Sequence, residues 1–145
     1  MTKAVTNATS SGELSINDEN DIVSARRAVR DAAIQLGFGQ TDVTRIVTAA
    51  SELARNTFKY AGGGVLRWRR IENGSRVGLE LQFVDRGPGI QDIDLVMQDG
   101  FSTSGGLGMG LPGARRLMDE LELESASGQG TTVTVRKWHR NSIPN

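Results

Sequence analysis

Apolar residues recur along the chain with two different periods, and these periods predict its helices and strands. From residue 22 to 36, and again from 41 to 60, they return every three or four positions, which indicates two helices that each bury one face. Thr41 is a suitable N-cap for the second helix, and the glycines at 62–64 are suited to end it. A third helix is expected to follow from Leu111, with Pro112 in its first turn and Leu121 on its apolar face.

Shorter stretches with strand-like patterns lie before, between and after these helices. Asn73-Gly74 is a strong hairpin signal, and the strand after it alternates apolar residues with Gly78, Glu80 and Gln82, so we expect one buried face and one wetter face. The element order predicts an α+β fold, a two-layer α/β sandwich whose mixed, mostly antiparallel sheet is covered on one face by helices. The predicted strands are 13–16, 65–71, 77–84, 121–127 and 131–138, with a short helix at 92–99.

Composition narrows the possible functions. A chain of 145 residues suits one domain, which we expect at 13–138 between tails at 1–12 and 139–145. Its formal net charge of zero disfavours nucleic acid as a partner. It has no cysteine, which excludes disulfides and thiolate metal sites, and no window approaches the roughly 20 apolar residues that cross a bilayer. We therefore expect a cytoplasmic protein without a membrane partner.

The polar face of the second helix carries the first candidate for chemistry. Glu52 and Asn56 are one helical turn apart, and Lys59 falls in the same arc. One interpretation is an ordinary solvated helix face. The other is that the amide oxygen of Asn56 binds Mg²⁺, which prefers hard oxygen ligands, while Glu52 accepts or orients the proton of an attacking hydroxyl.

The second candidate is the segment 85–90, which follows an apolar strand. Asp, Gly and Pro are common turn residues, so a plain turn is one interpretation. Alternatively, Asp85 projects from the strand end, where its oxygens can accept a hydrogen bond from the exocyclic amine of adenine. Gly87 and Gly89 would then let the backbone approach the base closely.

The third candidate is the glycine-rich run 105–113, which lies directly before a helix. Exposed amides at a helix start favour phosphate binding, and 101–104 before them is typical of a lid, with Phe101 as its apolar anchor. The run partly matches the dinucleotide fingerprint, but it does not follow a strand, and the P-loop motif is absent. His139 is the one histidine and is expected to be a surface residue, which leaves no histidine phosphoacceptor elsewhere.

In this order, with 128–131 closing the set, the three segments resemble the N, G1, G2 and terminal Gly-x-Gly-Thr boxes of the GHKL ATPase and kinase superfamily. Residues 51–56, 85–90 and 100–108 look more closely like those of stressosome switch kinases and anti-sigma regulatory kinases. The resemblance implies a Bergerat-type ATP site, with Asp85 on adenine, Thr131 supporting it, Asn56 on Mg²⁺ and Glu52 as base. The residues expected to bind ATP are Asn56, Lys59, Asp85, Gly87, Gly89, Ile90, Ser102, Thr103, Ser104, Gly105, Gly106, Leu107, Gly108, Met109, Gly110, Leu111 and Thr131.

The resemblance also implies a function: a serine/threonine kinase in a partner-switching stress response. Its substrate would be a STAS-domain antagonist protein, after which the kinase activates a metal-dependent phosphatase. Two alternatives stay open. One is a non-catalytic anti-sigma or phosphatase-activating module gated by nucleotide, and the other is a simple ATPase.

Overall fold

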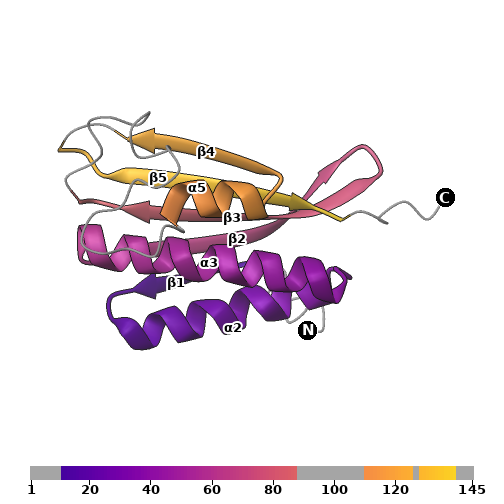
Figure 1. Ribbon diagram of the computed structural model, residues 1–145, viewed down its shortest axis with the longest axis horizontal. Helices are drawn as coiled ribbons and strands as arrows, with labels where there is room; N and C mark the ends of the chain where they lie inside the picture. The colour runs from indigo at the N-terminus through magenta and orange to yellow at the C-terminus, as the bar shows by residue number, and fades with distance from the viewer. Residues whose placement is uncertain (1–10, 88–109, 126–127, 140–145) are drawn as a thin grey trace.

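The computed structural model describes residues 11–87, 110–125 and 128–139, which form one five-stranded sheet with helices on one side (Figure 1). The predicted strands and the three main helices are present, whereas the predicted helix at 92–99 lies outside the described residues. The elements are β1 (Gly12–Ile16), α2 (Glu19–Gln35), α3 (Gln40–Ala61), β2 (Gly64–Asn73), β3 (Arg76–Asp85), α5 (Gly110–Leu117), β4 (Glu120–Ser125) and β5 (Thr131–Trp138).

The strand order is β1-β2-β3-β5-β4, and every described pair is antiparallel. The β2–β3 hairpin turns at Gly74, whose positive φ of 63° suits the predicted Asn-Gly turn. β5 pairs with both β3 and β4, so the last strand of the chain lies inside the sheet. This register places Asp85 opposite Gly64 on one side and Thr131 on the other.

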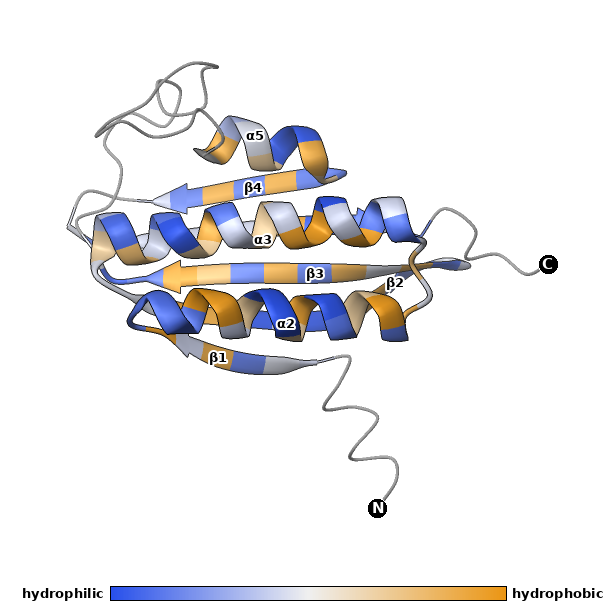
Figure 2. Cartoon of the chain, turned by 60° about the horizontal axis from the view of Figure 1, so that its bottom comes forward, coloured by the Kyte–Doolittle hydropathy of each residue, from blue (hydrophilic) through white to orange (hydrophobic). Residues whose placement is uncertain are grey.

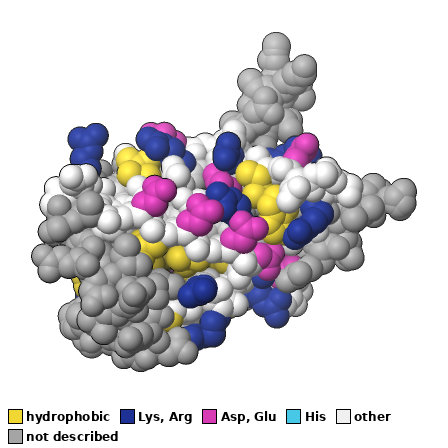
Figure 3. Space-filling view, turned by 90° about the horizontal axis from the view of Figure 1, so that it is seen from above, with side chains coloured by type: hydrophobic (Ala, Val, Ile, Leu, Met, Phe, Trp, Pro, Cys, Tyr) yellow, Lys and Arg dark blue, Asp and Glu magenta, His cyan; other side chains and the backbone are white. Residues whose placement is uncertain are grey.

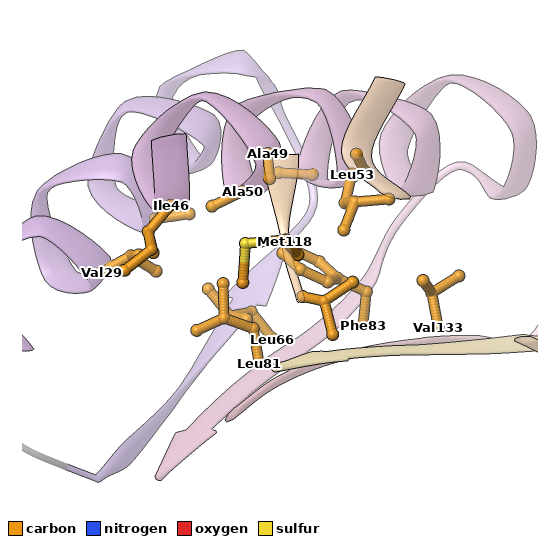
Figure 4. Close-up of a cluster of buried hydrophobic side chains, with 14 of the residues drawn as sticks. Val29, Ile46, Ala49, Ala50, Leu53, Leu66, Leu81, Phe83, Met118 and Val133 are labelled. Atoms are coloured by element: carbon orange, nitrogen blue, oxygen red, sulfur yellow. The ribbon is translucent and has the colours of Figure 1, made fainter. Parts of the chain in front are cut away.

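The hydrophobic core lies between the sheet and the helices. In Figure 2 the apolar sides of α2 and α3, which lie side by side, turn toward the sheet. Leu66, Leu81, Phe83 and Val133 point from the strands toward Ile46 and Leu53 of α3, and Met118 closes the same cluster (Figure 4). Burying one such large side chain stabilises the fold by about 1.5–3 kcal/mol. Fully buried alanines, among them Ala25, Ala32, Ala49 and Ala114, let the helices approach one another closely.

The two long helices begin differently from one another. Asp18 caps α2 by accepting a hydrogen bond from the backbone N of Asp21, whose side chain bonds back to the backbone of Asp18. The prediction that Thr41 caps the next helix is wrong. α3 begins at Gln40, and its cap is Gly39, which lies two residues before Thr41 and makes no side-chain hydrogen bond. The carbonyl of Gly39 accepts the first helical bond, from Val43 N at 2.9 Å, so Thr41 lies inside the first turn.

Two further details of the predicted pattern are corrected. Leu121 belongs to β4 and not to the helix before it, because α5 ends at Leu117 and Leu121 pairs with Val135. Glu80, expected on the wetter face of its strand, is only 7% exposed, because arginine side chains on the neighbouring strands cover it. None of the described helices combines the length and apolar character needed to cross a membrane.

Candidate active site

The carboxylate of Asp85 stands at the end of β3, between β2 and β5. Its Oδ1 accepts hydrogen bonds from the backbone N of Gly87 at 2.9 Å and of Thr131 at 3.2 Å. These two bonds hold the side chain in one orientation. Neither bond uses Oδ2, which makes no hydrogen bond to any other residue that the structure describes. Asp85 therefore presents a fixed, half-buried acceptor that can bind an N–H group of a ligand.

Glycines bring three distant chain segments against Asp85. A Cβ added at Gly130 would lie 2.2 Å from the carbonyl oxygen of Asp85, and φ at Gly130 is +87°. A Cβ added at Gly87 would lie 2.6 Å from the Cβ of Ala61, the last residue of α3. Only residues without a side chain permit these approaches. The end of α3, the end of β3 and the start of β5 consequently meet at one point.

Thr131 supports Asp85 through its backbone and not through its hydroxyl. Its N–H is one of the two donors to the carboxylate. The hydroxyl of Ser125 donates to the carbonyl oxygen of Gly130 at 3.0 Å, and its oxygen lies 2.9 Å from the hydroxyl oxygen of Thr131. Since the one proton of Ser125 goes to Gly130, Thr131 donates to Ser125. No sequence motif indicated Ser125, which braces the turn that delivers the Thr131 N–H.

The polar face of α3 carries the second group of predicted residues. The Glu52 side chain is 17% exposed, and Asn56, one turn later, is partly buried. The Asn56 amide makes no hydrogen bond to another described residue, so its oxygen is available to a cation or a ligand. Lys59 is exposed, with its Nζ 5.6 Å from the centre of the Tyr60 ring. All three lie on the half of the helix that ends beside Gly87.

Arg55 is a second residue that the sequence motifs did not indicate. Its Nη1 lies 3.1 Å from Oε2 of Glu52, one turn away along the helix. The arginine side chain is 48% exposed, so solvent screens this ion pair and its net stabilisation is small. In this pair the Glu52 carboxylate is turned toward Arg55. The spacing of Glu52 and Arg55 could have indicated this contact, since residues three apart are neighbours on a helix.

The glycine-rich segment is described only where it enters α5. Gly110 is the first residue of that helix, and Leu111 is 9% exposed and packs in the core. Figure 1 shows that α5 begins at the side of the molecule where β3 ends. The other predicted residues of this region lie outside the described residues: Gly89, Ile90, Ser102, Thr103, Ser104, Gly105, Gly106, Leu107, Gly108 and Met109.

The described residues whose pKa values are shifted lie on the opposite face of the sheet, away from Asp85. Burial raises the pKa of Glu80, but hydrogen bonds from Arg69 and Arg136 outweigh it, so the pKa falls below the ordinary 4.5. The same bond raises the pKa of Arg69, and bonds to Glu122, Glu120 and Glu80, opposed by burial, raise that of Arg136. Hydrogen bonds from Trp138 and Arg136 lower the pKa of Glu120.

These charged groups stabilise one another across four strands. Arg136 Nε lies 2.9 Å from Glu80, and its Nη1 lies 3.0 Å from Glu120 and 2.9 Å from Glu122. Figure 3, which looks onto the β4 side, shows acidic side chains in a row with basic ones among them. Because the acids and arginines satisfy each other, their pKa shifts report a structural network and not a catalytic site.

The described residues contain no group of three histidine, cysteine or acidic side chains that could hold a metal ion by themselves. His139 is half-buried, and its Nε2 lies 2.6 Å from the carbonyl oxygen of Gly37. Its ring also contacts Phe38, with 5.2 Å between ring centres. The histidine thus joins the end of β5 to the loop between α2 and α3, at the opposite end of β5 from Thr131.

Comparison with known proteins identifies the family of this chain. Residues 41–141 match the model of the histidine kinase-, DNA gyrase B-, and HSP90-like ATPases. The chain is 53% identical over 125 residues to the serine/threonine-protein kinase RsbT of Bacillus subtilis, covering 86% of this chain and 94% of RsbT. It is 33% identical over 120 residues to the anti-sigma F factor of a Thermoanaerobacter species, covering 79% of this chain and 82% of that protein.

Solved structures share the fold. The RsbU and RsbW domains of a Mycobacterium tuberculosis protein match with a TM-score of 0.58 and 21% identity, over 88% of this chain and 31% of that one. The catalytic domain of the histidine kinase ThkA, in a nucleotide-free form, matches with a TM-score of 0.52 and 16% identity, over 88% and 96%. The chain belongs to the histidine kinase-, DNA gyrase B- and HSP90-like ATPase family of ATP-binding proteins, in its serine/threonine-protein kinase branch.

Proposed function

We propose that this protein transfers the γ-phosphoryl group of ATP to a serine or threonine of a STAS-domain antagonist, as part of a partner-switching stress response. After the transfer, the kinase leaves this partner and activates a downstream phosphatase. The likeness to RsbT and to anti-sigma F factors supports a kinase that acts on protein partners. We also propose that residues 13–138 form the one kinase domain.

The observation that carries the proposal is the available oxygen of Asp85. Two backbone amides hold Oδ1, so Oδ2 is positioned to accept a hydrogen bond from the exocyclic amine of adenine. Gly87 and Gly130 let the end of α3 and the start of β5 pack closely around this carboxylate. The phosphates would then extend toward the start of α5, where the helix dipole and the backbone N–H groups of a helix start favour negative charge.

The residues of α3 fit the reacting end of the nucleotide. The amide oxygen of Asn56 is a suitable ligand for Mg²⁺, which would take its remaining ligands from phosphate and water. Bound there, Mg²⁺ would supply charge neutralisation on the phosphates. Lys59, exposed on the same face, can approach the phosphates as a second positive charge.

Phosphoryl transfer needs few further groups. The substrate hydroxyl oxygen forms a bond to the γ-phosphorus while the bond from that phosphorus to the bridging β–γ oxygen breaks, and ADP leaves. Glu52 orients the hydroxyl and accepts its proton. To do so, the Glu52 carboxylate must share or leave its bond to Arg55, so Arg55 influences how readily the base engages.

The test is phosphorylation of a purified STAS-domain partner by wild-type protein with Mg²⁺ and γ-labelled ATP. We expect label on serine or threonine of the partner. Glu52→Gln should lower the transfer rate by about 10²–10⁴-fold, the usual contribution of a positioned base, while ATP affinity stays within a few-fold. A folded wild-type protein that binds ATP but labels no STAS partner would refute the kinase proposal.

Glu13→Gln is the matched control for this variant. Glu13 also pairs with an arginine, Arg67, at the same 3.1 Å, but it lies on β1, the edge strand of the sheet. Both substitutions therefore remove a carboxylate from an exposed ion pair, and only one removes the proposed base. The transfer rate of Glu13→Gln should stay within a few-fold of wild type.

The non-catalytic alternative, a module gated by nucleotide, is distinguished by the Glu52 variant. The ion pair between Glu52 and Arg55 favours it, because that bond occupies the proposed base. If this alternative holds, Glu52→Gln leaves partner binding and regulatory output unchanged, whereas loss of both together with phosphorylation excludes it. Release of free phosphate without any partner would instead indicate a simple ATPase.

A further inference from the structure

Lys137 is a buried lysine on β5 that contacts two helical elements. Its side chain is only 4% exposed, and it projects from the helix-covered face of the sheet. Its Nζ donates a hydrogen bond to the carbonyl oxygen of Leu117, the last residue of α5, at 2.9 Å. The same atom lies 3.5 Å from Asp119 Oδ1 and 3.9 Å from Asp42 Oδ1, near the start of α3.

The position would otherwise suit an apolar side chain, since Val133 and Val135 precede it on the same face and are buried. Burying an ammonium group is unfavourable unless its protons are bonded and its charge is paired. Here one hydrogen bond goes to a carbonyl group, and two carboxylates within 4 Å pair the charge. The carbonyl is one of those left without a helical partner at the end of α5, where a positive charge is also favoured by the helix dipole.

α5 depends on such contacts for its position. With eight residues it is about 12 Å long and too short to be a stable helix by itself. Apolar packing of Leu111, Ala114 and Met118 holds it against the core, but such contacts are non-directional and permit small sliding movements. The bond from Lys137 is directional, so it determines how far along its axis the helix lies.

The two ends of α5 lie toward opposite ends of the sheet. Its last residue is at Lys137, whereas its first residue, Gly110, lies toward the side where β3 ends at Asp85 (Figure 1). A shift along the helix axis at one end is transmitted to the other, because the helix moves as a rigid rod over this length. We propose that Lys137 is a positioning residue for ATP: by anchoring the end of α5, it keeps the start of the helix where it meets the phosphates.

This inference rests on the proposed ATP site, and its test compares two neighbouring cations. Arg136 precedes Lys137, points to the opposite face of the sheet and bonds to carboxylates on β3 and β4, and none of these bonds reaches α5. Lys137→Met and Arg136→Met therefore both remove a paired charge from the same strand. Only the first removes the anchor of α5.

Binding of Mg·ATP is measured by titration calorimetry, at a temperature where circular dichroism shows each variant fully folded. We expect Lys137→Met to weaken binding about tenfold, because a small displacement of positioning groups has effects of at least this size, and Arg136→Met to change it less than about twofold. With a STAS-domain substrate, KM for ATP should rise while kcat stays near wild type, since Glu52 lies on α3. Amide hydrogen exchange should accelerate within α5 in Lys137→Met alone.

Unchanged affinity in Lys137→Met, or equal losses in both variants, would overturn the inference. If Lys137→Met does not fold, Asp119→Asn carries the test, because it keeps an acceptor for the Trp138 backbone N–H but weakens the charge beside Lys137. Its affinity should fall in the same direction by a smaller factor, and an unchanged value contradicts the inference. Failure of the wild-type protein to bind Mg·ATP would instead contradict the proposed function.

Discussion

Replacing Gly130 with alanine tests the contact between the β4–β5 turn and Asp85. The new Cβ would lie 2.2 Å from the carbonyl oxygen of Asp85 and 2.9 Å from the Cα of Arg86. Both distances are far below the roughly 3.5–4.0 Å of ordinary atomic contacts, so the turn must move away from β3. That movement pulls the Thr131 N–H from the Asp85 carboxylate, which it now meets at 3.2 Å.

The expected loss of stability has two parts. A side chain at the positive φ of Gly130, +87°, costs about 1 kcal/mol. Forcing the overlapping backbone atoms apart adds about 2 kcal/mol, the middle of the range for overpacked sites. The sum of about 3 kcal/mol corresponds to a fall in Tm of about 6–12 °C for a chain of this size.

Gly128 provides a matched control in the same turn. Its φ is +79°, close to that of Gly130, but a Cβ there would meet nothing within 4 Å. Gly128→Ala should therefore lose only the conformational part, about 1 kcal/mol or about 2–4 °C in Tm. Thermal unfolding and Mg·ATP titration are measured on both variants, and only Gly130→Ala should also bind ATP more weakly. Equal falls in Tm, or equal ATP affinities, would refute this account of the turn.

Three further predictions concern single side chains. Asp85→Asn should weaken ATP binding about 10–100-fold in calorimetry with little change in Tm, because Oδ1 can still accept both backbone bonds while a donor replaces the available oxygen. The folded state lowers the pKa of Glu80 below 4.5. The Glu80 carboxylate therefore stabilises the fold above that pH, and this contribution is lost as pH falls through the folded pKa. In urea unfolding at a series of pH values, the free energy of unfolding of Glu80→Gln should change less over this acidic range than that of the wild type. Asp18→Ala should lower Tm by about 2–4 °C through loss of the α2 cap, and an unchanged Tm would contradict it.

Local patterns predicted most of the elements correctly, because their causes are local. The Asn73-Gly74 turn joins β2 to β3 as expected, and Gly62 ends α3 with a positive φ of 79°. The start of α3 was predicted wrongly. A threonine with a helical pattern after it resembles a cap, but the backbone carbonyl of Gly39 already accepts the first helical bond, so the helix needs no side-chain cap.

The residues of the candidate site also divide into those that local patterns predict and those that they do not. Asp85, Glu52 and Asn56 could be proposed from sequence because strand ends and helix spacing place them without knowledge of the rest of the fold. The backbone role of Thr131 could not, because it depends on β5 pairing with β3 across 46 residues of chain, and the local bonds of Ser125 gain a role only through that pairing. The roles in ATP binding of all these residues, and of the glycine-rich segment up to Met109, stay predictions.

The sequence by itself determined the three main helices, the β2–β3 hairpin, the α+β class and the acid at the end of β3, because periodicity and turn chemistry act over a few neighbouring residues. The tertiary structure alone decided the strand order, with β5 between β3 and β4. That order places the Thr131 N–H on Asp85, buries Glu80 between two arginines and puts the Lys137 ammonium at the end of α5. Such contacts join residues distant in the chain, and only packing around one shared core brings them together.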